Sequence, residues 1–284
     1  MSLSNHIASL NERLTPTERR IAEAVLKDHT LLTYGTVSAL ADLVGTSSPS
    51  VVRFATKLGF DGFSELQQSA RKEVSTTNRS PSQRLRSDES VEPNQFKIES
   101  AVHAAFDVLT KTCLEAMAAP ILTATNVWIL SGETSRSGAI VLTSGLSMIR
   151  PNVHLVEEHS TGRELCGALP SDVAVVFDFS RYRKNSVIAA RTLSELGVHI
   201  VAITDGPLSP LSSLTENRCE LEIPAVGPFD SSVPAVIAAE LLVSQVVSEM
   251  HEKARDRIDR LELFWQATDT FLNYMPPTNK LPAR

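Results

Sequence analysis

Five short, mostly apolar runs in the second half of this 284-residue chain constrain its fold most strongly. Runs of this kind are typical of central strands in a parallel sheet that is covered on both faces. They are Val127–Leu130, Val153–Val156, Val173–Phe179, Val198–Ile203 and Cys219–Ile223. Helical patterns over 136–149, 185–196 and 233–250 lie between or after them. The alternation predicts an α/β domain with a parallel five-stranded sheet.

The chain changes character near residue 75. Residues 1–75 show helical patterns, whereas residues 76–95 are polar, contain proline and lack apolar periodicity, which is typical of an inter-domain linker. Residues 96–284 form the second predicted domain, which opens with one or two helices over 96–123. Its last element is predicted to be one long amphipathic helix over 246–274, with an apolar stripe of Met250, Ala254, Ile258, Leu261 and Trp265.

The composition is that of an ordinary globular protein, with 42% hydrophobic and 21% charged residues. No run approaches the roughly 18 to 20 apolar residues of a membrane span, and the first residues lack a secretory pattern. We therefore expect a cytoplasmic protein without membrane contact. Cys113, Cys166 and Cys219 are too few and too widely spaced for a disulfide framework or a zinc site, so neither a metal nor a cofactor is expected.

The net charge of −6 is unevenly distributed. Residues 76–284 supply all of it, residues 1–75 are neutral, and residues 1–86 carry a net charge of +3. A modestly basic front part on an acidic body favours an anionic partner for the front part alone.

The front domain contains a clear helix start. Thr15 is a favourable N-cap, Pro16 suits the first helical position, and Glu18 completes a capping box. Further helices are predicted over 36–44, 48–58 and 63–74. Gly59 is expected to end the second of these in a left-handed conformation.

Residues 37–54 have the pattern of a helix-turn-helix. Ala41 is small where two helices must cross closely, and Gly45 lies four residues later, where the chain must turn sharply. Ser47 is placed to cap the next helix. The apolar residues that would hold the crossing are Leu40, Val44, Val51 and Phe54.

Four polar residues remain on the outward side of the second helix of this motif: Ser48, Ser50, Arg53 and Lys57. In a helix-turn-helix these positions would face the major groove of DNA or its flanking phosphates. Serine hydroxyls and arginine can bind base edges or phosphates. The alternative is an ordinary helical hairpin whose exposed residues are simply polar.

The same region resembles a known family. The runs LTPTERRIAEAVLKD (14–28) and LADLVGTSSPSVVRFATKLGFDGFSELQ (40–67) are similar to the N-terminal domain of the RpiR family of bacterial transcription regulators. In that family a helix-turn-helix domain precedes a sugar isomerase (SIS) domain. The resemblance therefore implies an all-α helix-turn-helix domain followed by an α/β SIS-like domain.

Two loops of the second domain are candidates for binding an anion. The loop Ser131–Gly138 follows one predicted strand, and the loop Ser180–Ser186 follows another. In open α/β sheets, ligands bind beyond the carboxyl ends of strands, where helix N-termini present free N–H groups. Both loops combine hydroxyls with cations ahead of a helix, although ordinary surface loops can share that composition.

Residues 126–250 resemble SIS domains, whose ligands are phosphosugars. Ser135 and Ser180 match serines of the two family loops. The usual second loop, roughly S-x-S-G-x-T, is replaced here by Ser180-Arg-Tyr-Arg-Lys-Asn-Ser, which argues against a phosphosugar. Two interpretations remain: an anionic ligand neutralised by Arg183 and Lys184, or solvated charges at a helix start.

No catalytic residue stands out. Sugar isomerisation needs a base beside the reacting carbons, and His154, Glu157, Glu158 and His159 cluster after the second predicted strand. Their spacing singles out none of them, so an enzyme is not expected.

These observations predict a bacterial transcription regulator. Residues 1–75 would bind double-stranded operator DNA, and the SIS-like domain would bind a small anionic metabolite, a phosphosugar or an organic acid. Because one helix-turn-helix reads little DNA, a homodimer or tetramer is expected. The alternatives are a SIS-type phosphosugar isomerase with an accessory helical domain, and a SIS scaffold that dimerises without a ligand.

Overall fold

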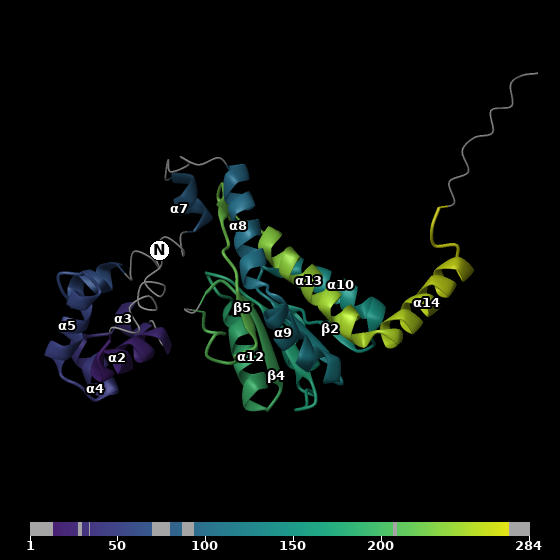
Figure 1. Cartoon of the computed structure of the whole chain (residues 1–284). Coiled ribbons are helices and arrows are strands. Elements are labelled where there is room, and N and C mark those ends of the chain that lie inside the picture. Colours follow the sequence, from purple (N-terminus) through teal and green to yellow (C-terminus); the bar gives the residue numbers. More distant parts are fainter. Residues whose placement is uncertain are drawn as a thin grey trace, which may run out of the picture.

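Helices alone build the first part of the protein. The computed structural model describes residues 14–27, 30–33, 35–69, 80–86, 94–206 and 209–272. The first helices are α2 (Pro16–Lys27), α3 (Thr30–Thr33), α4 (Val37–Val44) and α5 (Ser48–Lys57), and residues 63–69 are also helical. Figure 1 shows them as a body separate from the sheet. Their buried side chains form one cluster, in which Ile21, Leu40, Val51, Phe54 and Leu66 are at most 1% exposed.

The predicted helix starts and turns are largely confirmed. Thr15 N donates to Glu18 Oε2 at 2.8 Å, and Glu18 N donates to Thr15 Oγ1 at 3.4 Å, which is a reciprocal capping box. Gly45 ends α4 in the left-handed conformation, with φ of 65°. The prediction for Ser47 is wrong in one respect: it is the N-cap of α5, but its side chain accepts no capping hydrogen bond. Its hydroxyl lies 3.0 Å from that of Ser50 instead.

A short helix lies within the predicted linker. Helix α7 (Pro81–Arg86) starts with a reciprocal pair between Ser80 and Gln83, which satisfies the first backbone donors. Arg84 Nη1 donates to Asp230 Oδ1 at 2.6 Å and to the carbonyl of Pro228 at 3.4 Å. The linker is therefore attached to the second domain at this point; its residues outside 80–86 and 94–95 lie outside the described part of the chain.

The second domain contains the predicted parallel five-stranded sheet. The strand order is β2-β1-β3-β4-β5, and every pairing is parallel. The strands are β1 (Val127–Ser131), β2 (Val153–Leu155), β3 (Val173–Phe177), β4 (His199–Thr204) and β5 (Arg218–Glu220). A separate hairpin consists of β6 (Ala225–Val226) and β7 (Phe229–Asp230).

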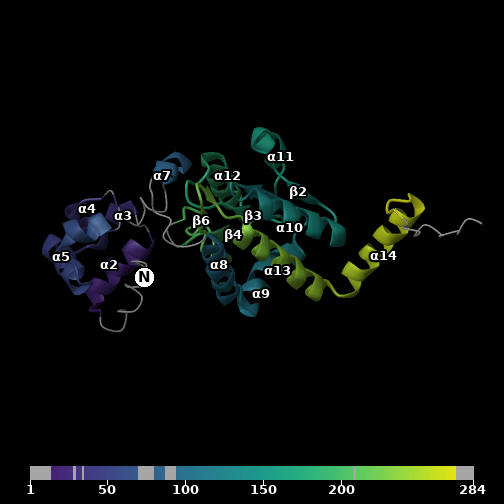
Figure 2. The same cartoon turned by 90° about the horizontal axis from the view of Figure 1, so that it is seen from above.

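Helices cover both faces of the sheet (Figure 1, Figure 2). One face packs on α8 (Asn94–Val108), α9 (Lys111–Thr123), α10 (Arg136–Ile149) and α13 (Val233–Met250). The other packs on α12 (Lys184–Glu195). Alternate strand residues serve the two faces: Ile129 and Val175 belong to the first core, and Leu130 and Val176 to the second.

This topology places two loops together. β1 and β3 are neighbours, yet the helices that follow them, α10 and α12, lie on opposite faces of the sheet. A crevice at the carboxyl ends of the strands is expected at such a switch point. The loops after β1 and β3 therefore form the place where a ligand would enter the fold.

The prediction of one long C-terminal helix is wrong. α13 ends at Met250, His251 adopts a positive φ of 46°, and α14 (Glu252–Ala267) starts as a separate helix. Ala254 still packs into the core, but α14 then runs out beyond the sheet in both views (Figure 1, Figure 2). α13 is long and apolar enough to cross a membrane by length and composition, but Ala238, Leu242 and Val246 are fully buried in the core.

Candidate functional site

The outer face of α5 carries a connected polar group. Ser50 Oγ lies 3.0 Å from Ser47 Oγ and accepts a hydrogen bond from Arg53 Nη2 at 3.2 Å. Arg53 is exposed, whereas Ser48 and Ser50 are half-buried. The hydroxyls and the guanidinium therefore lie together on the first two turns of the helix, with Val51 and Phe54 buried behind them.

Lys57 has a different environment from the other three predicted DNA-binding residues. Its Nζ donates to Glu18 Oε2 at 2.6 Å, which links the end of α5 to the start of α2. Burial alone would raise the pKa of Glu18, but the hydrogen bonds from Lys57 and Thr15 outweigh it and lower the pKa. Lys57 thus holds two helices together as well as carrying a charge on this side of the domain.

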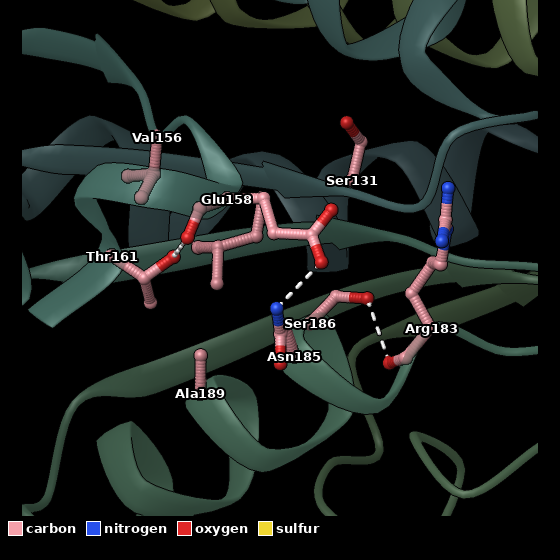
Figure 3. A pocket seen from close by; sticks show the side chains of 9 residues that line it. Ser131, Val156, Glu158, Thr161, Arg183, Asn185, Ser186 and Ala189 are labelled. Atoms are coloured by element: carbon pink, nitrogen blue, oxygen red, sulfur yellow. Dashed lines mark hydrogen bonds between the residues drawn. The ribbon is translucent and has the colours of Figure 1, made fainter.

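A small pocket lies between the loops that follow β1, β2 and β3 (Figure 3). Its volume is about 20 Å³, and it is lined by Leu130, Ser131, Val156, Glu158, Thr161, Arg183, Asn185, Ser186 and Ala189. Asn185 Nδ2 donates to Glu158 Oε1 at 2.5 Å across the pocket, as Figure 3 shows. Pockets for metabolite-sized ligands are usually larger, at roughly 300 to 1,000 Å³.

Ser135 is in the predicted loop but does not face this pocket. The residue is fully buried, and its hydroxyl donates to the carbonyl of Phe177 at 2.7 Å. Gly132 N donates to the same carbonyl at 2.9 Å. Both groups tie the β1–α10 loop to the end of β3.

Ser180 likewise interacts with the protein itself. Its backbone N–H donates to Asp205 Oδ2 at 2.7 Å, and its hydroxyl donates to the same oxygen. The hydroxyl of Tyr182 donates to the other carboxylate oxygen of Asp205 at 2.6 Å. Burial and the neighbouring Asp205 raise the pKa of Tyr182, so this phenol stays protonated and donating. Asp205 therefore sets the shape of the second loop.

Two arginines of the site are paired with glutamates. Arg183 Nη2 donates to Glu133 Oε2 across the two loops, and Arg136 makes two hydrogen bonds with Glu157. The hydrogen bonds from Arg136 lower the pKa of Glu157. Lys184, also predicted to bind the anion, is exposed at the first position of α12.

Asp178 is a buried carboxylate at the centre of the second loop. It is 2% exposed and accepts hydrogen bonds from Arg183 N at 3.0 Å, Phe179 N at 3.1 Å and the hydroxyl of Ser186. Burial raises its pKa to about 6, although these hydrogen bonds act in the opposite direction. Asp178 was not predicted from the sequence, although it is an acidic residue inside the apolar run Val173–Phe179.

Three of the four residues that could have served as an isomerase base have separate partners. His154 stacks on Trp128, with ring centroids 4.6 Å apart. Glu157 pairs with Arg136, and Glu158 binds Asn185. Within the described ranges, no group of three or more His, Cys, Asp or Glu side chains is placed to hold a metal ion.

Two family models match the chain. A model described as a helix-turn-helix domain of the rpiR family matches residues 1–77, and the SIS domain model matches residues 133–245. The first match contains α4 and α5, and the second contains the loop after β3 and residues 133–138 of the loop after β1. The resemblance identified from the sequence is thereby confirmed.

Named relatives are similar over most of their length. An uncharacterized HTH-type transcriptional regulator of Caldanaerobacter subterraneus subsp. tengcongensis is 25% identical over 84% of this chain and 84% of its own. The HTH-type transcriptional regulator HexR of Escherichia coli K12 is 23% identical over 92% and 93%. Among solved structures, the Vibrio vulnificus NanR protein complexed with ManNAc-6P has a TM-score of 0.54 at 19% identity, over 96% of this chain and 100% of that chain. The protein is therefore a transcription regulator with a helix-turn-helix domain of the rpiR family followed by a SIS domain.

Proposed function

We propose that this protein is a cytoplasmic, non-enzymatic regulator that binds operator DNA through α5 and responds to a small anionic metabolite through its SIS domain. The observation that carries the DNA-binding half is the Ser50–Arg53 pair on the exposed face of α5. The pair is supported by a closed helical core, so its geometry is held without the DNA. Ser48 lies half-buried at the start of the same helix, and Lys57 at its end is paired with Glu18.

The effector half rests on Arg183. Its guanidinium lies at the pocket rim, and its partner there is the carboxylate of Glu133, whose side chain is 76% exposed. An incoming anion can replace an exposed glutamate at little cost, because solvent-exposed ion pairs contribute only about 0 to 1 kcal/mol. Lys184 adds a second positive charge nearby, whereas Ser135 and Ser180 would support the loops rather than touch the ligand.

The DNA-binding half is tested with duplexes selected by the full-length protein from a random library. The logarithm of affinity should fall linearly with the logarithm of salt concentration, because phosphate contacts release counterions. Arg53→Ala should weaken binding about ten- to hundredfold, as expected for the loss of one base-reading or phosphate-binding arginine. Arg191→Ala, which removes the same charge from an exposed position on α12, is the matched control and should bind normally. A folded Arg53→Ala protein with unchanged affinity would contradict the proposal.

The effector half is tested by measuring selected-duplex affinity and binding heat with a panel of phosphosugars and organic acids. At least one anion should change the DNA affinity, and Arg183→Ala should weaken its binding about ten- to hundredfold, since a charge-assisted hydrogen bond contributes roughly 1.5 to 3 kcal/mol. Arg191→Ala again serves as the control. If no anion binds, the SIS domain acts as a scaffold, a result that the small volume of the pocket would explain.

A further inference from the structure

We propose that the carboxylate of Asp178 is a built-in anion that fills the N-terminal anion site of α12, so that the effector is an organic acid without a phosphate group. This inference rests on the proposed function and names the ligand class of the same pocket. It also makes Asp178 a specificity-determining residue rather than a ligand-binding one.

The position of Asp178 indicates that its carboxylate occupies the anion site of α12. The N-terminus of a helix attracts anions because its first N–H groups lack partners within the helix. Here the N–H of Arg183, the N-cap of α12, donates to Asp178, and so does the hydroxyl of Ser186 in the first turn. Two donors at this end of α12, the N–H of its N-cap and a hydroxyl of its first turn, therefore already bind a carboxylate of the protein.

The space between the two loops is already filled by the side chain of Asp178. A Cβ atom built on Gly132 would lie 2.4 Å from Asp178 Oδ1, so the carboxylate packs directly against the β1–α10 loop. The two loops are also joined behind it, because Gly132 N and Ser135 Oγ both donate to the carbonyl of Phe177. A phosphate cannot enter between the loops while the Asp178 side chain is there.

The negative charge of Asp178 also disfavours a phosphate at this site. Two backbone N–H groups and a hydroxyl donate to Asp178 and all three are neutral, while the carboxylate of Asp205 acts to raise its pKa further through like-charge repulsion. A phosphate dianion would meet this negative charge in a poorly solvated site. A carboxylate ligand at the rim would instead take the place that Glu133 now occupies on Arg183.

The test is a gain of function in the full-length chain. Binding of inorganic phosphate and of glucose 6-phosphate is measured by calorimetry for the unmodified protein, Asp178→Ser and Asp178→Asn. We expect no binding to the unmodified protein at millimolar concentration and at least a tenfold gain in affinity for phosphate in Asp178→Ser, because the N–H of Arg183 and the hydroxyl of Ser186 become available. Asp178→Asn keeps the size of the side chain while removing its charge, and should give a smaller gain.

Ser186→Ala in the Asp178→Ser background locates the gained site and should remove most of the gain. The inference is overturned if the unmodified protein binds phosphate or glucose 6-phosphate and Ser186→Ala weakens that binding. It is also overturned if folded Asp178→Ser gains no phosphate binding. These outcomes do not depend on DNA affinity, so a failure of the proposed regulator function would be seen separately, as unchanged binding of the selected duplex with every anion tested.

Discussion

Asp172 and Asp178 are buried carboxylates of the SIS domain with opposite electrostatic consequences. Asp172 is 1% exposed, and its oxygens accept hydrogen bonds from Asn126 N, Asn126 Nδ2, Trp128 Nε1 and Leu169 N. Burial would raise its pKa, but these donors outweigh burial and lower it. Asp178 has fewer partners, and burial raises its pKa to about 6. The first carboxylate stabilises the folded domain near neutral pH, whereas the second costs stability there.

The raised pKa of Asp178 predicts an unusual pH dependence of stability. A folded-state pKa of about 6 against an ordinary value of 3.8 means that the folded state binds this proton more tightly. Protonation of Asp178 therefore adds to the free energy of unfolding. This added stability is fully present below about pH 4 and is lost as the pH rises through 6, for a total of about 3 kcal/mol. Asp178→Asn lacks this loss.

The measurement is urea unfolding followed by tryptophan fluorescence. Both tryptophans, Trp128 and Trp265, belong to the second domain, so the signal reports on that domain. Relative to Asp178→Asn, the unmodified protein should lose about 3 kcal/mol of unfolding free energy between pH 4 and pH 7. Comparing the two proteins at each pH cancels the opposite effects of Asp172 and Glu18. A difference that is constant with pH would contradict the raised pKa.

At the scale of elements, α7 connects the linker to the hairpin that precedes α13. The ion pair between Arg84 and Asp230 is largely shielded, since both side chains are 13% exposed. α13 starts next to α10, where a Cβ atom on Gly138 would lie 2.8 Å from the carbonyl of Ala235. The linker is therefore attached to the hairpin just before α13, and the start of α13 packs against α10, the helix that follows the β1 loop.

Arg84→Ala should release α7 from the second domain. A carboxylate left unpaired in a shielded place is costly, so undocking of the short helix is the cheaper response. We expect hydrogen exchange of the α7 amides to rise at least tenfold, as measured by mass spectrometry. Arg86→Ala changes an exposed residue of the same helix and should leave exchange unchanged. Equal exchange in both variants would show that Arg84 does not hold the helix.

The sequence predicted those elements whose signals are local. Apolar runs identified the five strands, and Thr15 with Glu18 identified the start of α2. The break at His251 was missed because the apolar pattern continues from Met250 to Ala254 across it. The six-residue α7 was missed because so short a helix has no apolar periodicity.

The pocket was predicted less completely because its contacts join distant parts of the chain. Ser135 and Ser180 were placed on the correct loops, but the groups that bind their hydroxyls lie 42 and 25 residues away, at Phe177 and Asp205. Arg183 is the one predicted effector residue that lines the pocket. Spacing along the sequence carries no information about which acceptor each hydroxyl will meet.

At the scale of the whole molecule, α14 presents an uncovered apolar surface. Leu263 and Phe264 are 64% and 65% exposed, and both belong to α14, which extends beyond the sheet (Figure 1). Large exposed apolar side chains that lie together favour contact with another protein surface. For a regulator that reads two half-sites of DNA, that surface would belong to a second copy of the chain.

Sedimentation should therefore show a dimer at micromolar concentration, and a variant with both Leu263→Asp and Phe264→Asp should be mainly monomeric. Charges placed in an apolar interface carry a large desolvation cost, which explains the direction of the change. Glu262→Gln alters the adjacent exposed residue and should leave the dimer intact. A monomeric unmodified protein would contradict the expected assembly, and a dimeric double variant would place the interface elsewhere.

The separation of the buried clusters has a consequence for how such proteins can be recombined. The cluster around Phe54 draws its buried residues from Leu14 to Leu66, and those of the second domain come from Ala105 to Ala254. Since these cores share no residue, an exchange of everything before the linker would cut through neither of them. Chimeras that carry the front domain of one such protein on the back domain of another should therefore fold, and under the proposed function they would transfer the choice of DNA target independently of the choice of metabolite.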